Sequence, residues 1–379
     1  MPANLRELEM RVRSAAIATV AVMATSLVIH AQSPQKPAQP AFRTGTTLVE
    51  VSAIVTVDGV PVTDLRPEDV TVLDNGTPQP LVAFERVDLG RGEQPSERRD
   101  FVLMLDDLHI APARTQPTIT AALAFVDGLG PHDRLGLVNT GVDDLTIQLT
   151  TEREPIRRAI RKFRGQQGNA VPMEVEMRAR TAMQVLTSVA SSMRSDAAER
   201  RSVLLISEGH TTFVQDAPVN LDPVARAAFT DYLSVLREAA LANVSIYTVD
   251  PRGLMAPGGG AAVSSRNTDL RAASQRVDVD STQIATLRNA QAVRNSELFG
   301  SLAILARNTG GVQTLWSNDL TKVYPQMLRD SRQYYRIAYA QPEPANGKRQ
   351  PPSRKISVKV SRPGVEVRAR QQYAPATQS

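Results

Sequence analysis

Two kinds of hydrophobic pattern alternate along this chain of 379 residues. Near the N-terminus, residues 46–57 alternate between apolar and polar positions, which is typical of a strand with one buried face. Further along, short and mostly apolar runs indicate strands that are buried on both faces of a parallel sheet. These runs cover residues 101–105, 134–138, 201–207 and 244–249. The pattern therefore predicts a β segment followed by a sheet of a different kind.

Helical spacing of apolar residues separates the buried runs. The helical stretches cover residues 119–126, 152–163, 173–193, 229–243, 301–309 and 320–332. Strands that alternate with helices over so long a stretch indicate an open α/β sheet with helices on both faces.

Strand-like alternation returns after the last helix, so β segments flank the α/β region on both sides. We expect a small β module at 45–87, an α/β domain at 100–332 and a C-terminal β segment at 333–373. A polar stretch at 255–295 is too long for an ordinary connection and indicates an insert. Whether the two β segments form one domain stays open at this point.

The first residues indicate export. Basic residues precede an apolar stretch of residues 15–29, which is too short for a membrane-spanning helix, and Ala31 offers a cleavage position. Residues 1–31 therefore read as a signal peptide, and the Pro- and Gln-rich residues 32–44 as a linker. The alternative is an uncleaved N-terminal anchor, which would be the protein's contact with a membrane. Either reading predicts a secreted or periplasmic protein.

The composition and the absence of certain motifs exclude several kinds of site. The chain has no cysteine, which excludes disulfides, thiolate metal sites and a cysteine nucleophile, so an exported fold must be held by packing. The net charge is +5 without dense basic blocks, and we expect no nucleic-acid partner. The sequence has no GxGxxG after the first buried strand, no phosphate-binding loop and no GxSxG motif.

Several segments together resemble the von Willebrand factor A-related proteins first described as an acidobacterial family. These segments include VLMLDDLHIAP, DRLGLVNTG, RSVLLISEGHTT, VSIYTVDPRGL, LARNTGG and YYRIAYAQP, and their order and spacing carry the resemblance over residues 45–373. The resemblance implies a doubly wound, mostly parallel sheet of the von Willebrand A or Rossmann-like type. It also implies a binding protein and not an enzyme, with its ligand edge at the carboxyl ends of the strands.

The same family binds a divalent metal through an Asp-x-Ser-x-Ser loop, a threonine and a further aspartate. Asp106 matches the first aspartate, but Leu108 and Ile110 stand at the serine positions. The threonine position falls near Asn169, and Glu208 stands at the second aspartate. The resemblance therefore implies a degenerate metal site.

Other side chains near these positions could rebuild such a site. Asp107 and His109 follow the first buried strand, and His210 follows Glu208 after a neighbouring strand. Imidazole with carboxylate suits zinc, manganese, iron or nickel, so one hypothesis is a remodelled site of Asp106 and Glu208 with these helpers and Asn169. The alternative is that the two aspartates cap the next helix or turn and that His109 bonds the loop.

From these observations we expect an exported, non-enzymatic module that binds a protein or cell-envelope partner. Its ligand rim would contain polar residues from four loops: Asp107, His109, Asn169, His210, Asp250 and Arg252. No cofactor is certain, and a divalent metal at the degenerate site is the one candidate. The alternatives are an exported metal-dependent hydrolase that uses Asp106, His109, Glu208 and His210, and a structural envelope component assembled through its β segments.

Overall fold

The computed structural model describes nine stretches of the chain: 47–90, 94–141, 146–168, 171–195, 200–209, 223–253, 300–314, 317–344 and 350–375. They belong to one compact unit, Thr46–Ser379. The expected signal peptide, the linker at 32–44 and the insert at 255–295 lie outside the described residues. Within those nine stretches, no helix combines the length and the hydropathy that crossing a bilayer requires.

One sheet has six strands in the order β11-β10-β9-β6-β7-β8. These strands are β6 (Asp100–Leu105), β7 (Arg134–Asn139), β8 (Ile147–Thr150), β9 (Arg201–Ile206), β10 (Val244–Val249) and β11 (Gln313–Thr314). Neighbours pair in parallel, except that β8 is antiparallel to β7. The central strands β9 and β10 are fully buried, which explains their mostly apolar sequences.

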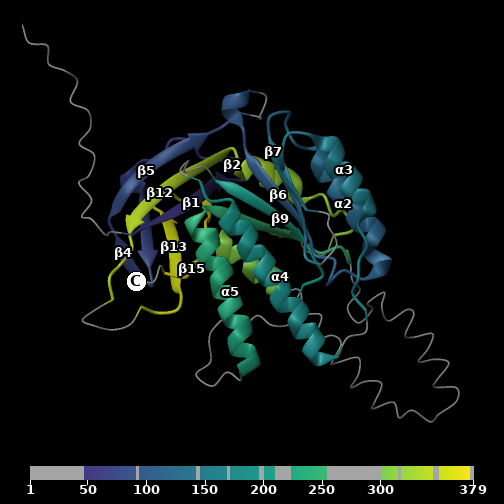
Figure 1. Ribbon diagram of the computed structural model, residues 1–379. Coiled ribbons are helices and arrows are strands. Elements are labelled where there is room, and N and C mark those ends of the chain that lie inside the picture. The colour runs from purple at the N-terminus through teal and green to yellow at the C-terminus, as the bar shows by residue number, and fades with distance from the viewer. Residues whose placement is uncertain are drawn as a thin grey trace, which may run out of the picture. The chain divides into compact units, whose positions relative to one another are not determined.

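Helices cover both faces of this sheet (Figure 1). One face packs on α2 (Thr115–Asp127), α3 (Arg153–Lys162) and α8 (Val323–Asp330), and the other on α4 (Pro172–Ser192), α5 (Pro223–Leu241) and the helical residues 300–309. Alternate residues of β6 divide between the faces: Leu103 and Leu105 join the first core, and Val102 and Met104 the second. Short 3-10 turns lie at Pro67–Asp69, Pro95–Glu97 and Pro112–Arg114.

The remaining strands form two antiparallel sheets. One contains β14 (Glu366–Arg368), β1 (Leu48–Val57), β12 (Gln333–Ala340) and β5 (Leu81–Asp88), with β2 (Val60–Pro61) beside β1. The other contains β15 (Gln372–Tyr373), β13 (Arg354–Val360), β3 (Val70–Asp74) and β4 (Thr77–Gln79). The two sheets share an apolar core that includes Val51, Val72, Ile337 and Ile356.

The fold class expected from the sequence, a doubly wound and mostly parallel α/β sheet with flanking β segments, is wrong for this chain. The two antiparallel sheets hold nine of the fifteen strands in the described stretches, so the fold is β-rich. Parallel pairing is confined to the six-stranded sheet. The sequence predicts the β segments as separate flanks of the α/β region. In the structure, β1 from the N-terminal segment pairs with β12 from the C-terminal segment. Alternation identifies a strand but not its partner.

Two turns have the backbone that a tight hairpin requires. Asp58 and Gly59 between β1 and β2 have φ of 50° and 76°, and Asn75 and Gly76 between β3 and β4 have φ of 46° and 82°. Positive φ at both central positions matches the right-handed twist of the strands, and Asn, Asp and Gly adopt it at least cost. The residues at these turns therefore favour both hairpins.

Buried polar groups connect the two antiparallel sheets to each other and to the helix α8. Asp74 is fully buried and accepts hydrogen bonds from the hydroxyls of Tyr339 (2.9 Å) and Tyr373 (2.8 Å) and from Arg354 Nε (2.5 Å). Between the sheets and the helices, Arg368 binds Asp330 through two hydrogen bonds of 2.6 Å. Charged groups removed from water require such partners.

Candidate functional site

The acidic loops predicted from the sequence lie at the carboxyl edge of the six-stranded sheet. Asp106 follows β6, Thr140 follows β7, Ser207 follows β9 and Asp250 follows β10. These four strands are adjacent and parallel, so their carboxyl ends meet at one edge. We call this edge, with residues 106–111, 140–141, 165–168, 207–209 and 250–253, the loop rim.

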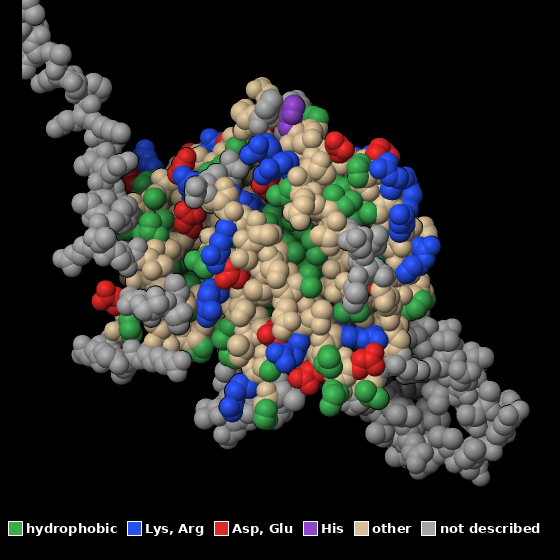
Figure 2. Space-filling view, viewed as in Figure 1, with side chains coloured by type: hydrophobic (Ala, Val, Ile, Leu, Met, Phe, Trp, Pro, Cys, Tyr) green, Lys and Arg blue, Asp and Glu red, His purple; other side chains and the backbone are tan. Residues whose placement is uncertain are grey.

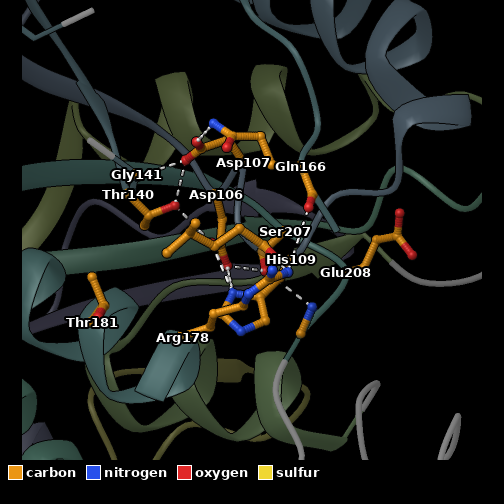
Figure 3. A network of polar contacts seen from close by, with 12 residues as sticks. Asp106, Asp107, His109, Thr140, Gly141, Gln166, Arg178, Thr181, Ser207 and Glu208 are labelled. Carbon is orange, nitrogen blue, oxygen red and sulfur yellow. Dashed lines mark hydrogen bonds and ion pairs between the residues drawn. The ribbon is translucent and has the colours of Figure 1, made fainter. Parts of the chain in front are cut away.

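Asp106 is the centre of a buried polar network in the loop rim (Figure 3). Its side chain is fully buried, and its carboxylate oxygens lie 2.9 and 3.0 Å from His109 Nδ1. The hydroxyls of Thr140 and Ser207 also donate to it, at 2.8 and 2.6 Å. His109 can reach back because residues 106–109 form a turn, closed by a hydrogen bond from His109 N to Asp106 O. Asp106 thereby connects three neighbouring strand ends.

Asp107 connects a different set of loops. Its carboxylate accepts hydrogen bonds from Gly141 N (2.7 Å) and Gln166 Nε2 (2.6 Å), and Oδ1 lies 2.8 Å from Thr140 Oγ1, whose single proton it shares with Asp106. The backbone amide of Gln166 also donates to Asp107 O at 2.7 Å. A β-carbon at position 141 would lie 2.3 Å from Asp107 Oδ2, so glycine is needed for this approach. Asp107 therefore fixes the loop that leads into α4.

Glu208 holds the loop after β6 from the other side. Its side chain lies close to the backbone of that loop, and Oε1 accepts a hydrogen bond from Ala111 N at 2.8 Å. Burial raises the pKa of the Glu208 carboxyl, and this outweighs the lowering by Ala111 N–H and by the nearby Arg252. Asp106 and Glu208, the two residues of the predicted metal site, thus bind different protein groups.

The described residues contain no group of three or more His, Asp or Glu side chains arranged to hold a metal ion. Asn169 and His210, two of the predicted helpers, lie outside the described stretches. His109 and Asp107 are both engaged with protein groups in the network above. A divalent metal at this edge therefore stays a prediction from the sequence.

Asp250 and Arg252, the last two predicted rim residues, bind each other. Arg252 Nε lies 2.9 and 3.0 Å from the two Asp250 oxygens, and Arg252 N donates to Asp250 Oδ1 at 2.9 Å. Both side chains are buried, with exposed fractions of 4% and 6%. An aspartate side chain often accepts a hydrogen bond from the backbone N–H two residues later and thereby stabilises a turn, as Asp250 does here.

Sequence reasoning missed two members of the network, Thr140 and Gln166. The sequence did contain a signal for Thr140. Thr140 comes soon after the buried run 134–138, with only Asn139 between, much as Asp106 comes after the run 101–105. Gln166 has no such signal, since nothing in the polar stretch 165–168 distinguishes one glutamine from the next.

The arrangement does not resemble that of a serine hydrolase. A nucleophilic serine needs a base within hydrogen-bond reach, usually a histidine that a carboxylate orients. Here Ser207 Oγ donates directly to Asp106, and the same carboxylate binds His109. Asp106 and Ser207 are both fully buried. In the structure, these groups connect the loops of the rim by hydrogen bonds.

No protein-family model matches the chain, and no curated protein matches it. One solved structure with some similarity is a mutant of the PilB minor pilin from Streptococcus sanguinis, with 8% sequence identity and a TM-score of 0.32. The match covers 62% of this chain and 61% of the pilin, so the chain spans about three fifths of that protein's length. At this TM-score the similarity decides neither fold nor function.

The pKa of Glu208 leads to a prediction on pH dependence. Because the pKa is raised above its ordinary value of 4.5 in the folded protein, the unfolded chain loses this proton first as pH rises. The Glu208 contribution to folding stability should therefore fall from about pH 4.5 upward and level off above the raised pKa. Glu208→Gln removes this loss and keeps an acceptor for Ala111 N.

Urea unfolding of the wild type and of Glu208→Gln between pH 4 and 8 measures this effect. We expect the variant to gain stability relative to the wild type as pH rises. The exposed Glu343, changed to Gln, is the matched control. A difference between wild type and variant that stays constant across this range would contradict the prediction.

Proposed function

We propose that the protein is an exported, non-enzymatic module that binds a protein partner at the loop rim and the first turns of α4. The observation that carries this proposal is the distribution of exposed large hydrophobic side chains. Four of the seven in the described stretches belong to one short run: Val171, Met173, Val175 and Met177. Their exposed fractions reach 72% at Met173 and 63% at Met177. We call this run the α4 patch; Met173 and Met177, four residues apart, share one side of the helix, and Val175 faces the other side.

The α4 patch is continuous with the loop rim. Gln166 and Gln167 are bonded to Asp107 O and Ile110 O, and α4 begins shortly afterwards at Pro172. Arg178 Nη1 lies 3.5 Å from Leu108 O and 3.4 Å from Gln166 O, so the side chain of Arg178 in the second turn of α4 reaches the rim. At a rise of about 1.5 Å per residue, the residues before Arg178 reach roughly 10 Å beyond it.

The exposed apolar side chains of this patch favour the binding of a partner. Neighbouring exposed apolar side chains on a soluble protein mark interaction sites more often than scattered ones do. Methionine suits such a surface because its flexible, polarizable side chain adapts to different partners. In Figure 2, hydrophobic side chains lie interspersed with acidic and basic ones at this end of α4, and protein interfaces commonly combine both kinds.

The rim network supports the same function. Asp106, Asp107 and Glu208 hold four loops against one another, which pre-organises the surface from which α4 projects. The resemblance to von Willebrand factor A-related proteins and the signal peptide expected at 1–31 lead to the same proposal of an exported binding protein. The partner would be a protein of the cell envelope or the extracellular space.

A photo-crosslinking residue at position 173 tests this function directly. We expect the full chain to crosslink a protein from an envelope extract when the probe replaces Met173. A probe at Gln184, which is exposed on the same helix but further from the rim, should crosslink it much less. Equal labelling from both positions, or none from position 173, would exclude the proposed surface.

The double variant Met173→Asp, Met177→Asp gives a quantitative prediction. Each side chain is largely exposed, so the free energy of unfolding should change by no more than about 0.5 kcal/mol. Two charges placed in an apolar contact should weaken capture of the crosslinked partner at least about tenfold. Binding of the partner to immobilised protein measures the loss, with Gln184→Asp as the matched control. Unchanged capture by the double variant would contradict the prediction.

A further inference from the structure

A second site lies at the opposite end of the six-stranded sheet from the loop rim. A cavity of about 230 Å³ is bounded by the start of β1, residues 47–50, and by the end of α5, residues 240–243. Arg201, the first residue of β9, also lines it. Because the rim follows the ends of β9 and β10 and this cavity precedes their starts, the two sites use different surfaces.

The first half of β1 presents an open backbone edge to this cavity. On one side, β12 pairs with Leu48–Ala53, and a hydrogen bond from Gln341 N to Thr47 O fixes which residues face it. Hydrogen-bonding direction alternates along an antiparallel strand, so Leu48, Glu50 and Ser52 turn their N–H and C=O groups to the other side. There β14 covers Ile54–Thr56, and among the described residues no strand covers 48–52.

The wall opposite this edge carries one polar side chain, Asn243, beside the apolar Ala240, Leu241 and Ala242. Asn243 follows α5 with a left-handed backbone (φ 49°), and its side chain is 4% exposed. Its Oδ1 accepts a hydrogen bond from Ser52 Oγ at 3.1 Å, whereas Nδ2 is buried without an acceptor in the described part of the chain. A buried amide without its partner is costly. A carbonyl group that entered the cavity would supply the missing acceptor.

We propose that this cavity binds a short extended peptide segment of another protein, which adds to the open edge of β1 as an antiparallel strand. Main-chain groups of the peptide would pair with Leu48 and Glu50, as in other cases of strand addition to a sheet edge. Exposed edges of this kind are sites where strands from other chains pair. The proposal is independent of the function proposed for the loop rim.

The strand β14 indicates which peptide sequence fits. It pairs with the continuation of the same edge, and Val367 lies opposite Val55 and packs on the β core. Its neighbours Glu366 and Arg368 lie opposite Thr56 and Ile54 and are the residues whose amides face β1. The mouth of the cavity carries Leu48 and Leu241, which are 38% and 48% exposed. The expected occupant therefore alternates valine with another residue.

The probe is a fluorescent, capped peptide of sequence Val-Thr-Val-Thr, measured by anisotropy with the full chain. Two isomers serve as matched controls, one N-methylated at both threonines and one at both valines. Methylation at threonine removes the amides that face β1 and should weaken binding at least about tenfold, because two hydrogen bonds are lost. Methylation at valine removes amides that face away and should change the affinity less than about threefold.

Amide hydrogen exchange and one protein variant locate the peptide. Bound peptide should protect the amides of Leu48 and Glu50. Leu241→Asp, at the exposed mouth, should weaken binding, whereas Met173→Asp in the α4 patch should not. No saturable binding at millimolar concentration would overturn the proposal. So would equal binding by the two methylated isomers, or protection at Ile54 without protection at Leu48 and Glu50.

Discussion

Replacing Asp106 with Ala is expected to lower the free energy of unfolding by about 3–5 kcal/mol, because His109 Nδ1 and the Ser207 hydroxyl lose this carboxylate acceptor and the Thr140 hydroxyl keeps only Asp107. The side chain is fully buried and accepts hydrogen bonds from His109, Thr140 and Ser207. None of these groups can turn to water without opening the rim. Urea unfolding at pH 7, followed by circular dichroism, measures the loss.

Asp127→Ala is the matched control for Asp106→Ala. Asp127 has a 61% exposed side chain and forms a surface ion pair with Arg157. Exposed pairs of this kind contribute about 0–1 kcal/mol, so this variant should unfold close to the wild type. If Asp106→Ala cost no more than Asp127→Ala, the network in the rim would have no part in stability. The pre-organised rim proposed above would then lose its basis.

The second large effect is expected at Asp74 in the antiparallel sheets. Asp74→Ala leaves the Arg354 guanidinium and the hydroxyls of Tyr339 and Tyr373 without their acceptor. Removing one member of a buried charged cluster typically costs about 3–5 kcal/mol. Thermal or urea unfolding measures this cost. Because the variant's partners belong to β12, β13 and β15, the C-terminal strands should lose amide protection first.

Two further variants make the Asp74 result interpretable. Asp64→Ala removes an aspartate that is 71% exposed and paired with Arg362, and should cost less than about 1 kcal/mol. Tyr373→Phe removes one of the three donors and should cost about 1 kcal/mol. An Asp74→Ala protein as stable as Asp64→Ala would show that the cluster contributes nothing to the association of the two sheets.

The sequence predicted individual elements better than their assembly. The apolar run 101–105 corresponds to β6 (Asp100–Leu105), and the run 244–249 to β10 (Val244–Val249). Short buried strands have a strong local signature because both faces must be apolar. The fold class was wrong because the pairing of β1 with β12 joins residues nearly 300 positions apart, and no local pattern carries that information.

The candidate site was predicted in part. Asp106, Asp107, His109, Glu208, Asp250 and Arg252 do lie at one edge of the six-stranded sheet, but they engage protein groups there. Position after a buried strand predicts that a side chain reaches this edge. It does not predict whether a neighbouring loop supplies a hydrogen-bond donor, as Gln166 does for Asp107. That depends on loop conformation, which has no periodic signal.

The pairing of β1 with β12 and of β3 with β13 also sets an order of events during synthesis. β1 and β3 are synthesised nearly 300 residues before their partners β12 and β13. Until then the apolar side chains of Val49, Val51 and Val72 lack the residues of β12 and β13 against which they pack. Contacts at such separation form late and slowly. In the exported protein proposed above, this delay would leave the N-terminal strands without their sheet partners until the C-terminal strands are made.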